Sequence, residues 1–355
     1  MGTGHRAARA VLALLAGCAF AVACGWLLDV RPRELAAHFR GVSSTTVAFC
    51  LLSACLVYAL QAFRRHLVMR QHAPLRYGDV VAGHVLGTAF NTLLPARGGD
   101  VIRVEYFARR SKRSRSTLVG VELVDRWLHC AGWFPPLAIF AVAGALPGWF
   151  GAGFGVASAV LAGWAIGMAL VARRRALAPD ASRLHRIVGS IRLGLGGFRT
   201  RRTVWIALIV APLPWLWEAA ALDFAAHTFG IELPFAGAFA VLVASNIATM
   251  VPSPGSVGSV EAGGAFALAL LGVDHSAALA FMFVYHLTQL APAVLAGLAV
   301  LVVRAASGRR QRSSDSTSVD AGSPAAAIAI APPATHRAAH APRNAVADIE
   351  GARTL

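Results

Sequence analysis

Residues 45–63 read TTVAFCLLSACLVYALQAF and carry no charged side chain. A helix needs about 20 apolar residues to cross the hydrocarbon core of a bilayer, and this stretch is close to that length. Arg64 and Arg65 follow it directly. Positive charge beside an apolar helix is typical of the cytoplasmic side of a membrane. The stretch therefore predicts a spanning helix that ends in the cytoplasm.

The composition of the whole chain agrees with a membrane location. Of the 355 residues, 57% are hydrophobic and 14% are charged, whereas a soluble domain has about 25% charged residues. This excludes a soluble enzyme. The formal net charge is +16, but the basic residues cluster beside apolar blocks and so indicate membrane orientation rather than nucleic-acid binding. The five cysteines lie in apolar stretches without the spacing of a disulfide framework or a zinc site.

Further apolar blocks predict an all-α, polytopic membrane helix bundle with about six spanning helices. The candidate spans lie at about 10–28, 45–63, 117–145, 152–172, 203–222 and 278–303. The first block is longer than the apolar region of a signal peptide, so we interpret it as a membrane helix. Residues 1–306 are predicted to form the membrane domain. The Ala-, Pro- and Arg-rich residues 307–355 are predicted to form a disordered cytoplasmic tail.

Two broken apolar segments do not fit simple crossings. Residues 64–76 and 97–115 are both strongly basic and are both expected in the cytoplasm, so the segment between them is predicted to be a re-entrant hairpin. Residues 235–275 contain no Lys or Arg and are broken by Pro and Gly at 252–258, which predicts a second hairpin from the outside. With six spans, both termini then lie in the cytoplasm, beneath a bacterial inner membrane.

The two breaks share a local pattern. Residues 92–98, TLLPARG, match residues 249–255, TMVPSPG, as Thr, two apolar residues, Pro, two others and Gly. Paired interruptions of this kind are typical of inverted-repeat transporters, whose central site lies between the repeats. An inverted repeat is therefore a hypothesis. The predicted helix breaks, which would form the central cavity, are Pro95, Gly98, Gly99, Pro252, Pro254, Gly255 and Gly258.

Residues around the first break suit an anionic lipid headgroup. Arg97 and Arg103 carry planar guanidinium groups that match phosphate, and the glycines between them offer backbone N–H groups at a helix start. Asp100 is expected to cap that helix or to hold an arginine. Together with Asn91 these residues form the predicted headgroup site at the cytoplasmic leaflet. The alternative is an interfacial turn whose arginines only set the orientation of the chain.

The charged face of the block 117–145 consists of Glu122, Asp125, Arg126 and His129. Because buried charges are costly in a membrane, this face is expected to point into the protein and to form ion pairs. The spacing favours a Glu122–Arg126 pair. Asp125 is expected to meet Arg97 or Arg103. A structural ion-pair network is one interpretation of this face. A metal site of Glu122, Asp125 and His129 is an alternative that matches no known motif. No metal, cofactor or catalytic residue is therefore predicted.

Two further acids lie in apolar surroundings. Glu261 has no basic residue near it in the sequence, so it is expected either to pair with an arginine of the first half or to stay protonated. A role in proton coupling is one hypothesis for it. Glu218 lies between Trp217 and apolar residues and is interpreted as an intramembrane acid or as part of an aromatic belt.

The chain resembles the lysylphosphatidylglycerol synthase transmembrane-region family, whose members are also described as flippase-like. The resemblance covers roughly residues 8–305 and rests on residues 91–103 (NTLLPARGGDVIR), 122–126 (ELVDR) and 252–261 (PSPGSVGSVE). It implies an α-helical inner-membrane protein that moves or handles lipids. Synthases of the family carry an additional soluble aminoacyl-transfer domain, and residues 307–355 are too short and too polar to supply one. Aminoacyl transfer is therefore not expected.

The residues predict a translocase for an anionic lipid, and the resemblance implies a polyprenyl- or hopanoid-type lipid as a further candidate. Its expected partners are membrane lipids and lipid-biosynthesis proteins, and nucleic acid is not expected. One alternative is a membrane enzyme that acts on a lipid-linked substrate, which would need a general base or a metal among the charged residues of 117–145. Another is an accessory subunit of a lipid- or glycolipid-modifying system, in which the charges only hold the helices together.

Overall fold

The computed structural model describes residues 43–94, 97–146, 148, 150–173, 183–195, 201–250 and 254–320. Within these ranges the chain is helical and contains no strand, which confirms the predicted all-α class. The predicted span at 10–28 and the predicted breaks at Pro95 and Pro252 lie outside the described residues.

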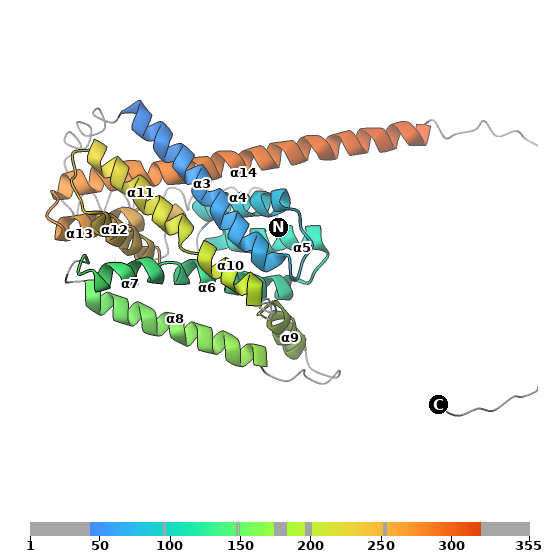
Figure 1. The fold of residues 1–355 in the computed structure, drawn as a ribbon. Coiled ribbons are helices and arrows are strands. Elements are labelled where there is room, and N and C mark those ends of the chain that lie inside the picture. Colours follow the sequence, from blue (N-terminus) through green and yellow to red (C-terminus); the bar gives the residue numbers. More distant parts are fainter. Residues whose placement is uncertain are drawn as a thin grey trace, which may run out of the picture. The chain divides into compact units, whose positions relative to one another are not determined.

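The helices are drawn in Figure 1. Their bounds are α3 Ser44–Met69, α4 Tyr77–Leu93, α5 Gly98–Ser111, α6 Arg115–Ala131, α7 Phe134–Val142, α8 Phe150–Arg173, α9 Arg183–Leu195, α10 Arg201–Val210, α11 Leu213–Thr228, α12 Phe235–Ala248, the 3-10 turn η2 Pro254–Ser256, α13 Ser259–Leu270 and α14 His275–Asp320.

Three helical stretches are long and apolar enough to cross a membrane. They are Ser44–Met69, Trp205–Thr228 and His275–Val303. Gly155–Val171, α12 and α13 are shorter apolar helices. A chain with such helices is a membrane protein by length and composition. The number of six spans stays a prediction.

The block 117–145, predicted as one span, is two helices, α6 and α7. They are separated at Gly132, where a Cβ atom would lie 2.4 Å from the backbone oxygen of Ala211. Pro135 and Pro136 then occupy the first turn of α7, where the missing N–H groups have no intrahelical partner to lose. The block is therefore divided between two helices, because apolar content alone does not show where a neighbouring backbone comes close. Its place as one of the six spans stays a prediction.

Two helical hairpins lie at opposite ends of the molecule. In Figure 1 the pair α4 and α5 lies at the right, and the pair α12 and α13 lies at the left, with α3, α11 and α14 running between the two ends. This arrangement is the one expected for hairpins that enter a membrane from opposite sides. The inverted repeat itself stays a prediction.

Apolar side chains fill two cores, one in each half. The first is formed by α11 to α14 and contains the fully buried Trp215, Phe239 and Phe281. The second is formed mainly by α3 to α6 and contains Phe107 and Leu128. Because lipid is as apolar as these side chains, close packing rather than escape from water holds such helices together.

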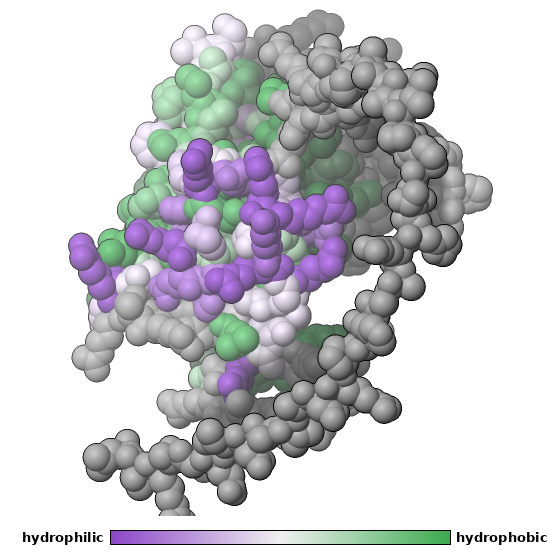
Figure 2. Space-filling view, turned by 90° about the vertical axis from the view of Figure 1, so that its right-hand side faces the viewer, coloured by the Kyte–Doolittle hydropathy of each residue, from purple (hydrophilic) through white to green (hydrophobic). Residues whose placement is uncertain are grey.

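Basic side chains gather at one end of the molecule. Figure 2 shows hydrophilic residues across the end at which α3 and α5 finish and α4 and α6 begin. The exposed basic residues of these helix ends are Arg70, Arg76, Arg109, Arg110, Lys112, Arg113 and Arg115. This is the end predicted to face the cytoplasm, and the orientation stays a prediction.

The last helix is longer than the sequence suggested. The compact unit of the chain ends at Ala305, but α14 continues to Asp320. Residues 307–320, predicted to belong to a tail without helical structure, are therefore helical. Residues 309–320 contain no Pro and no Gly, so nothing in their backbone chemistry stops a helix that is already formed. Residues 321–355 lie outside the described part of the chain.

Candidate functional site

Gly99 allows the two helices of the first hairpin, α4 and α5, to pack in close contact. A Cβ atom on Gly99 would lie 2.0 Å from the backbone oxygen of Gly87, so α5 approaches α4 more closely than a larger residue would permit. The Asn91 side-chain amide donates to Asp100 Oδ1 at 3.1 Å, and its oxygen accepts from the Asp100 backbone N–H at 3.2 Å. Asn91, predicted to bind a headgroup, thus also ties the end of α4 to the start of α5.

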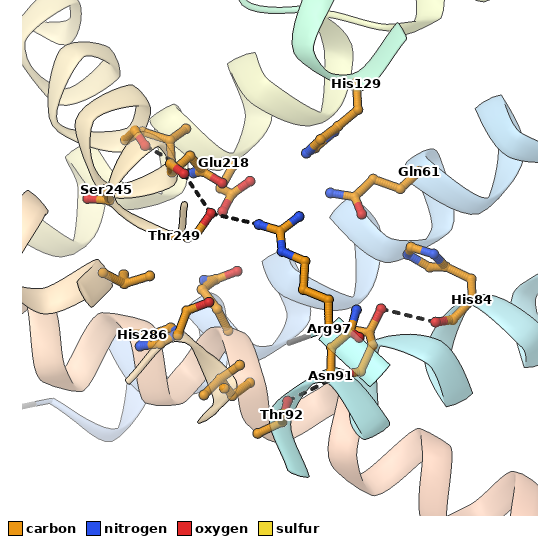
Figure 3. Close-up of a pocket in the computed structure, with 18 of the residues that line it drawn as sticks. Gln61, His84, Asn91, Thr92, Arg97, His129, Glu218, Ser245, Thr249 and His286 are labelled. Carbon is orange, nitrogen blue, oxygen red and sulfur yellow. Dashed lines mark hydrogen bonds between the residues drawn. The ribbon is translucent and has the colours of Figure 1, made fainter. Parts of the chain in front are cut away.

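The tips of the two hairpins touch each other. Arg97 has a left-handed backbone (φ 55°) immediately before α5, and its side chain crosses the cavity to the end of α12, where it donates to Thr249 Oγ1 at 2.9 Å (Figure 3). In the second hairpin, Gly255 also has a positive φ of 62°. A Cβ atom there would lie 3.1 Å from the methyl group of Thr92. Residues of the two predicted breaks therefore lie against one another.

A cavity of about 590 Å³ lies where the tips meet. Its volume is within the range of small-molecule sites, roughly 300–1,000 Å³. Both hairpins contribute to it, together with α3, α6, α11 and α14 (Figure 3). Its polar lining includes Gln61, Arg64, Arg65, His84, Asn91, Arg97, Arg103, Asp125, Arg126, His129, Glu218, Ser245, Asn246, Thr249 and His286.

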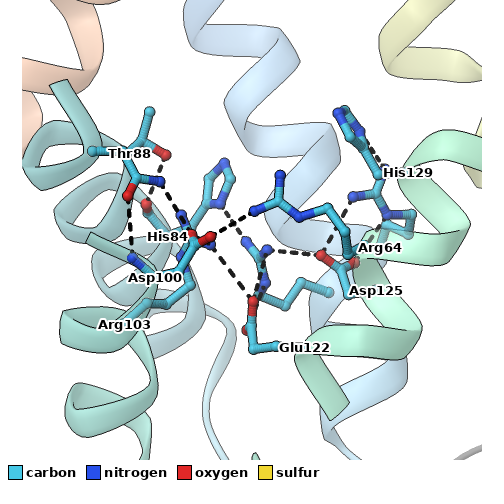
Figure 4. Close-up of polar contacts among 11 residues, drawn as sticks. Arg64, His84, Thr88, Asp100, Arg103, Glu122, Asp125 and His129 are labelled. Atoms are coloured by element: carbon cyan, nitrogen blue, oxygen red, sulfur yellow. Dashed lines mark hydrogen bonds and ion pairs between the residues drawn. The ribbon is translucent and has the colours of Figure 1, made fainter. Parts of the chain in front are cut away.

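Asp125 is the most deeply buried acid beside the cavity. Its side chain is 1% exposed, and one oxygen lies 3.0 Å from Arg64 Nε while the other lies 2.7 Å from Arg65 Nη2 (Figure 4). Both arginines come from the C-terminal part of α3, whereas Asp125 comes from α6. A buried charge needs a partner of opposite sign, so these contacts fix α3 against α6.

Two further carboxylates extend the ion pairs to α5. Glu122 accepts from Arg65 Nη2 at 3.2 Å and lies 3.5 Å from Arg103 Nη1. Asp100 lies 2.8 Å from both Arg103 Nη1 and Arg126 Nη2. With Arg97, which lines the same cavity, we call these eight side chains the arginine network. Its members are Arg64, Arg65, Arg97, Arg103, Arg126, Asp100, Glu122 and Asp125.

The sequence analysis selected the three acids of this network and three of its five arginines, but it predicted different ion-pair partners for them. Glu122 contacts Arg65 and Arg103 instead of Arg126, which contacts Asp100. Asp125 pairs with two arginines of α3 rather than with Arg97 or Arg103. The reason is that α3 brings two adjacent guanidinium groups to the acidic face of α6, and buried pairs outcompete a contact along one helix.

Two histidines face guanidinium groups. Arg65 Nη1 contacts His84 Nδ1, and Arg64 Nη1 lies 3.4 Å from His129 Nδ1. Because a guanidinium only donates hydrogen bonds, the ring nitrogen that faces it must be an acceptor, which makes each imidazole neutral. Within the described residues, no group of three His, Cys, Asp or Glu side chains could hold a metal ion, and Glu122, Asp125 and His129 all contact arginine.

The acids of the second half have different surroundings. Glu261 Oε1 lies 2.8 Å from His286 Nδ1, and Oε2 accepts from the Gly258 backbone N–H at 2.7 Å. Its partner is therefore a histidine of α14, whereas the sequence suggested an arginine of the first half or none. The Glu218 side chain lines the cavity (Figure 3), next to Tyr285, whose hydroxyl donates to the Glu218 backbone oxygen at 3.0 Å.

Sequence reasoning missed several of the residues that build the site, above all Arg64 and Arg65. They were interpreted as loop residues that follow a spanning helix. The signal that could have found them is the apolar run after them, because Leu67, Val68 and Met69 are buried and belong to the same helix. The arginines therefore lie inside α3, where burial forces them to find acidic partners.

The comparison with known protein families identifies the family of the chain. A family model described as "Lysylphosphatidylglycerol synthase TM region" matches residues 14–297, a range that contains both hairpins and the whole arginine network. No curated protein matches the chain.

Proposed function

Because the chain belongs to the lysylphosphatidylglycerol synthase transmembrane-region family, it is an integral membrane protein related to lipid handling, and we propose that it moves an anionic phospholipid between the two leaflets. We further propose that it does so in a bacterial inner membrane, with the basic end shown in Figure 2 and both termini in the cytoplasm.

The observation that carries this proposal is the charge of the arginine network beside the cavity. The arginine network contains five guanidinium groups and three carboxylates, which leaves an excess of two positive charges among these side chains. The neutral histidines beside it add no charge. A phosphate group supplies negative charge and two neighbouring oxygens, which the planar guanidinium of an arginine can bind with two parallel N–H groups.

Two guanidinium groups remain open to such a ligand. Arg97 donates to the Thr249 hydroxyl of the opposite hairpin at 2.9 Å, and the Arg126 side chain is 33% exposed. Arg64, by contrast, is 2% exposed and is held by Asp125. We therefore assign phosphate binding to Arg97 and Arg126, and the structural role to the buried arginines of α3.

The position of the cavity suits transfer of a headgroup through the protein. It lies between hairpins that come from opposite ends of the molecule, so small movements of either tip would expose the site to one end or the other. Broken segments that meet at mid-depth are how transporters place a polar site inside a bilayer.

Replacing Arg97 by alanine is the direct test. We expect flipping of fluorescent phosphatidylglycerol in proteoliposomes to slow by about 10- to 100-fold, because a hydrogen bond to a charged group contributes about 1.5–3 kcal/mol. Dithionite quenching of the outer leaflet measures the rate. A labelled polyprenyl phosphate and a labelled phosphatidylcholine, assayed in parallel, show whether the phosphate or the net charge is recognised.

Arg113→Ala is the matched control, since Arg113 is an exposed arginine of the basic end and lies outside the cavity. It should flip lipid at the wild-type rate. Wild-type protein that accelerates no anionic lipid, or an Arg97→Ala variant as fast as wild type, would contradict the proposal.

A further inference from the structure

A buried acid and a histidine on the far side of the cavity are not explained by phosphate binding. Glu261 on α13 and His286 on α14 are 5% and 7% exposed, and Glu261 Oε1 lies 2.8 Å from His286 Nδ1. The second carboxylate oxygen is held by the Gly258 backbone N–H at 2.7 Å. His286 also lines the cavity, as Figure 3 shows.

His286 differs from the other histidines of the cavity in the charge of the side chain that it contacts. His84 and His129 face guanidinium groups, which oppose the gain of a proton. His286 faces the Glu261 carboxylate instead. Among the described histidines that line the cavity, His286 is therefore the one whose ring nitrogen is hydrogen-bonded to a carboxylate, so this pair offers two atoms that can hold a proton.

Close packing holds the pair in place. A Cβ atom on Gly264 would lie 2.4 Å from the Met282 methyl group of α14, and one on Gly263 would lie 2.5 Å from Ala248 Cβ of α12. The two glycines follow Glu261 after one residue, so α13 lies tightly between its neighbours at this level. The carboxylate and the imidazole therefore keep their contact without needing a flexible side chain.

The charge balance of the cavity links this pair to the lipid. The arginine network has five positive and three negative charges, and Glu218 and Glu261 add two negative charges, so the sum is zero when the acids are ionised and the histidines are neutral. One proton on the Glu261–His286 pair makes the sum +1. One phosphodiester then returns it to zero.

We propose that the Glu261–His286 pair is a proton-binding site that takes up one proton together with each anionic headgroup, so that lipid movement is coupled to proton movement. The inference rests on the proposed translocase function. The proton comes from cavity water, forms an N–H bond on the imidazole or an O–H bond on the carboxyl group, and returns to water on release. No covalent bond of the lipid changes.

Other titratable and charged groups face the same cavity and must be separated from this pair by experiment. On the helices packed around it they are Arg97 at the first hairpin tip, Glu218 on α11, Tyr285 on α14, and His84 and His129 beside the arginine network. Tyr58 on α3 lies next to the cavity, since its hydroxyl donates to the backbone oxygen of Gln289, which lines it. Substitutions at Glu261 and His286 leave all of these side chains unchanged.

Glu261→Gln tests the proposal because the glutamine oxygen can still accept from Gly258 while the group no longer titrates. For purified wild-type protein in detergent, we expect the affinity for phosphatidylglycerol to fall as the pH rises from about 6 to about 8. The fall is up to about tenfold per pH unit over part of this range, because one linked proton gives that slope. Glu261→Gln and His286→Gln should each bind with an affinity that changes less with pH than that of the wild type, and variants that both keep the full wild-type slope would contradict the proposal.

Glu105→Gln is the matched control. Glu105 lies at the basic end, where hydrogen bonds from Arg115 and Arg109 lower its pKa to about 2, so it does not titrate in the range tested. This variant should keep the wild-type pH dependence.

Proton movement is measured directly with wild-type proteoliposomes that contain the pH dye pyranine. We expect inward flipping of phosphatidylglycerol to acidify the lumen, and an inward proton gradient to accelerate flipping. Wild-type protein that flips lipid with an unchanged pyranine signal and no response to the gradient would overturn the proton proposal alone. Wild-type protein that neither binds nor flips an anionic lipid would overturn the translocase function, and the proton proposal with it.

Discussion

Replacing Asp125 by asparagine is expected to lower the free energy of unfolding by about 3–5 kcal/mol, the usual cost of removing one partner of a buried ion pair. Asp125 contacts Arg64 at 3.0 Å and Arg65 at 2.7 Å, so its loss leaves guanidinium charge buried without compensation. Asparagine has nearly the same shape, which keeps the packing of α3 on α6. Thermal unfolding of the purified protein in detergent measures the effect.

Two variants show whether this loss comes from the buried charge. Asp79→Asn removes the partner of Arg110 in a pair at 3.1 Å whose side chains are 53% and 22% exposed, and such a pair contributes about 0–1 kcal/mol. Adding Arg64→Gln to Asp125→Asn should recover part of the lost stability, because it removes one uncompensated charge. Equal melting of Asp125→Asn and wild type, or a double variant less stable than the single one, would contradict the role of the arginine network.

The membrane class could be predicted because it depends on a local property. An apolar run of the length of residues 45–63 predicts a spanning helix without reference to the rest of the chain, and α3 confirms it. The positions of the two hairpin breaks are local in the same sense, since Pro and Gly interrupt helices wherever they occur. Local chemistry also explains why Glu122 and Asp125 were expected on one inward face of a helix.

The partners of those residues could not be predicted, because they depend on contacts between distant segments. Asp125 is separated by 61 residues from Arg64, and Arg97 is separated by 152 residues from Thr249. Spacing rules for a single helix select neighbours three or four residues away, so they favoured a Glu122–Arg126 pair. In the folded chain, the cost of burying two arginines of α3 decides the pairing instead.

The histidine partner of Glu261 shows the same limit. Its sequence neighbourhood contains no base, which left a distant arginine or a retained proton as the two expectations. The structure places a histidine 25 residues along the chain beside it, because the turn between α13 and α14 folds the two helices against each other. A single sequence gives the residue types of such a pair but not the register at which two helices meet.

Replacing Gly99 by alanine is expected to destabilise the protein by about 1–3 kcal/mol and to reduce flipping. The new Cβ atom would lie 2.0 Å from the Gly87 backbone oxygen and 2.5 Å from the Asn91 backbone nitrogen. Backbone atoms cannot rotate away, so α5 must move off α4, and Arg97 at its start must move with it. Thermal unfolding and the phosphatidylglycerol flipping assay measure the two effects.

The sign of this effect distinguishes a close helix contact from ordinary helix propensity. Alanine normally stabilises a helix by about 1 kcal/mol relative to glycine, so a glycine without a packing role should gain stability when it is replaced. Gly78 in the first turn of α4 is such a position, because no atom lies within 4 Å of the place where its Cβ would be. Gly78→Ala should therefore melt at or above the wild-type temperature. A Gly99→Ala variant that also melts higher and flips lipid normally would show that the site forms without the close approach of α4 and α5.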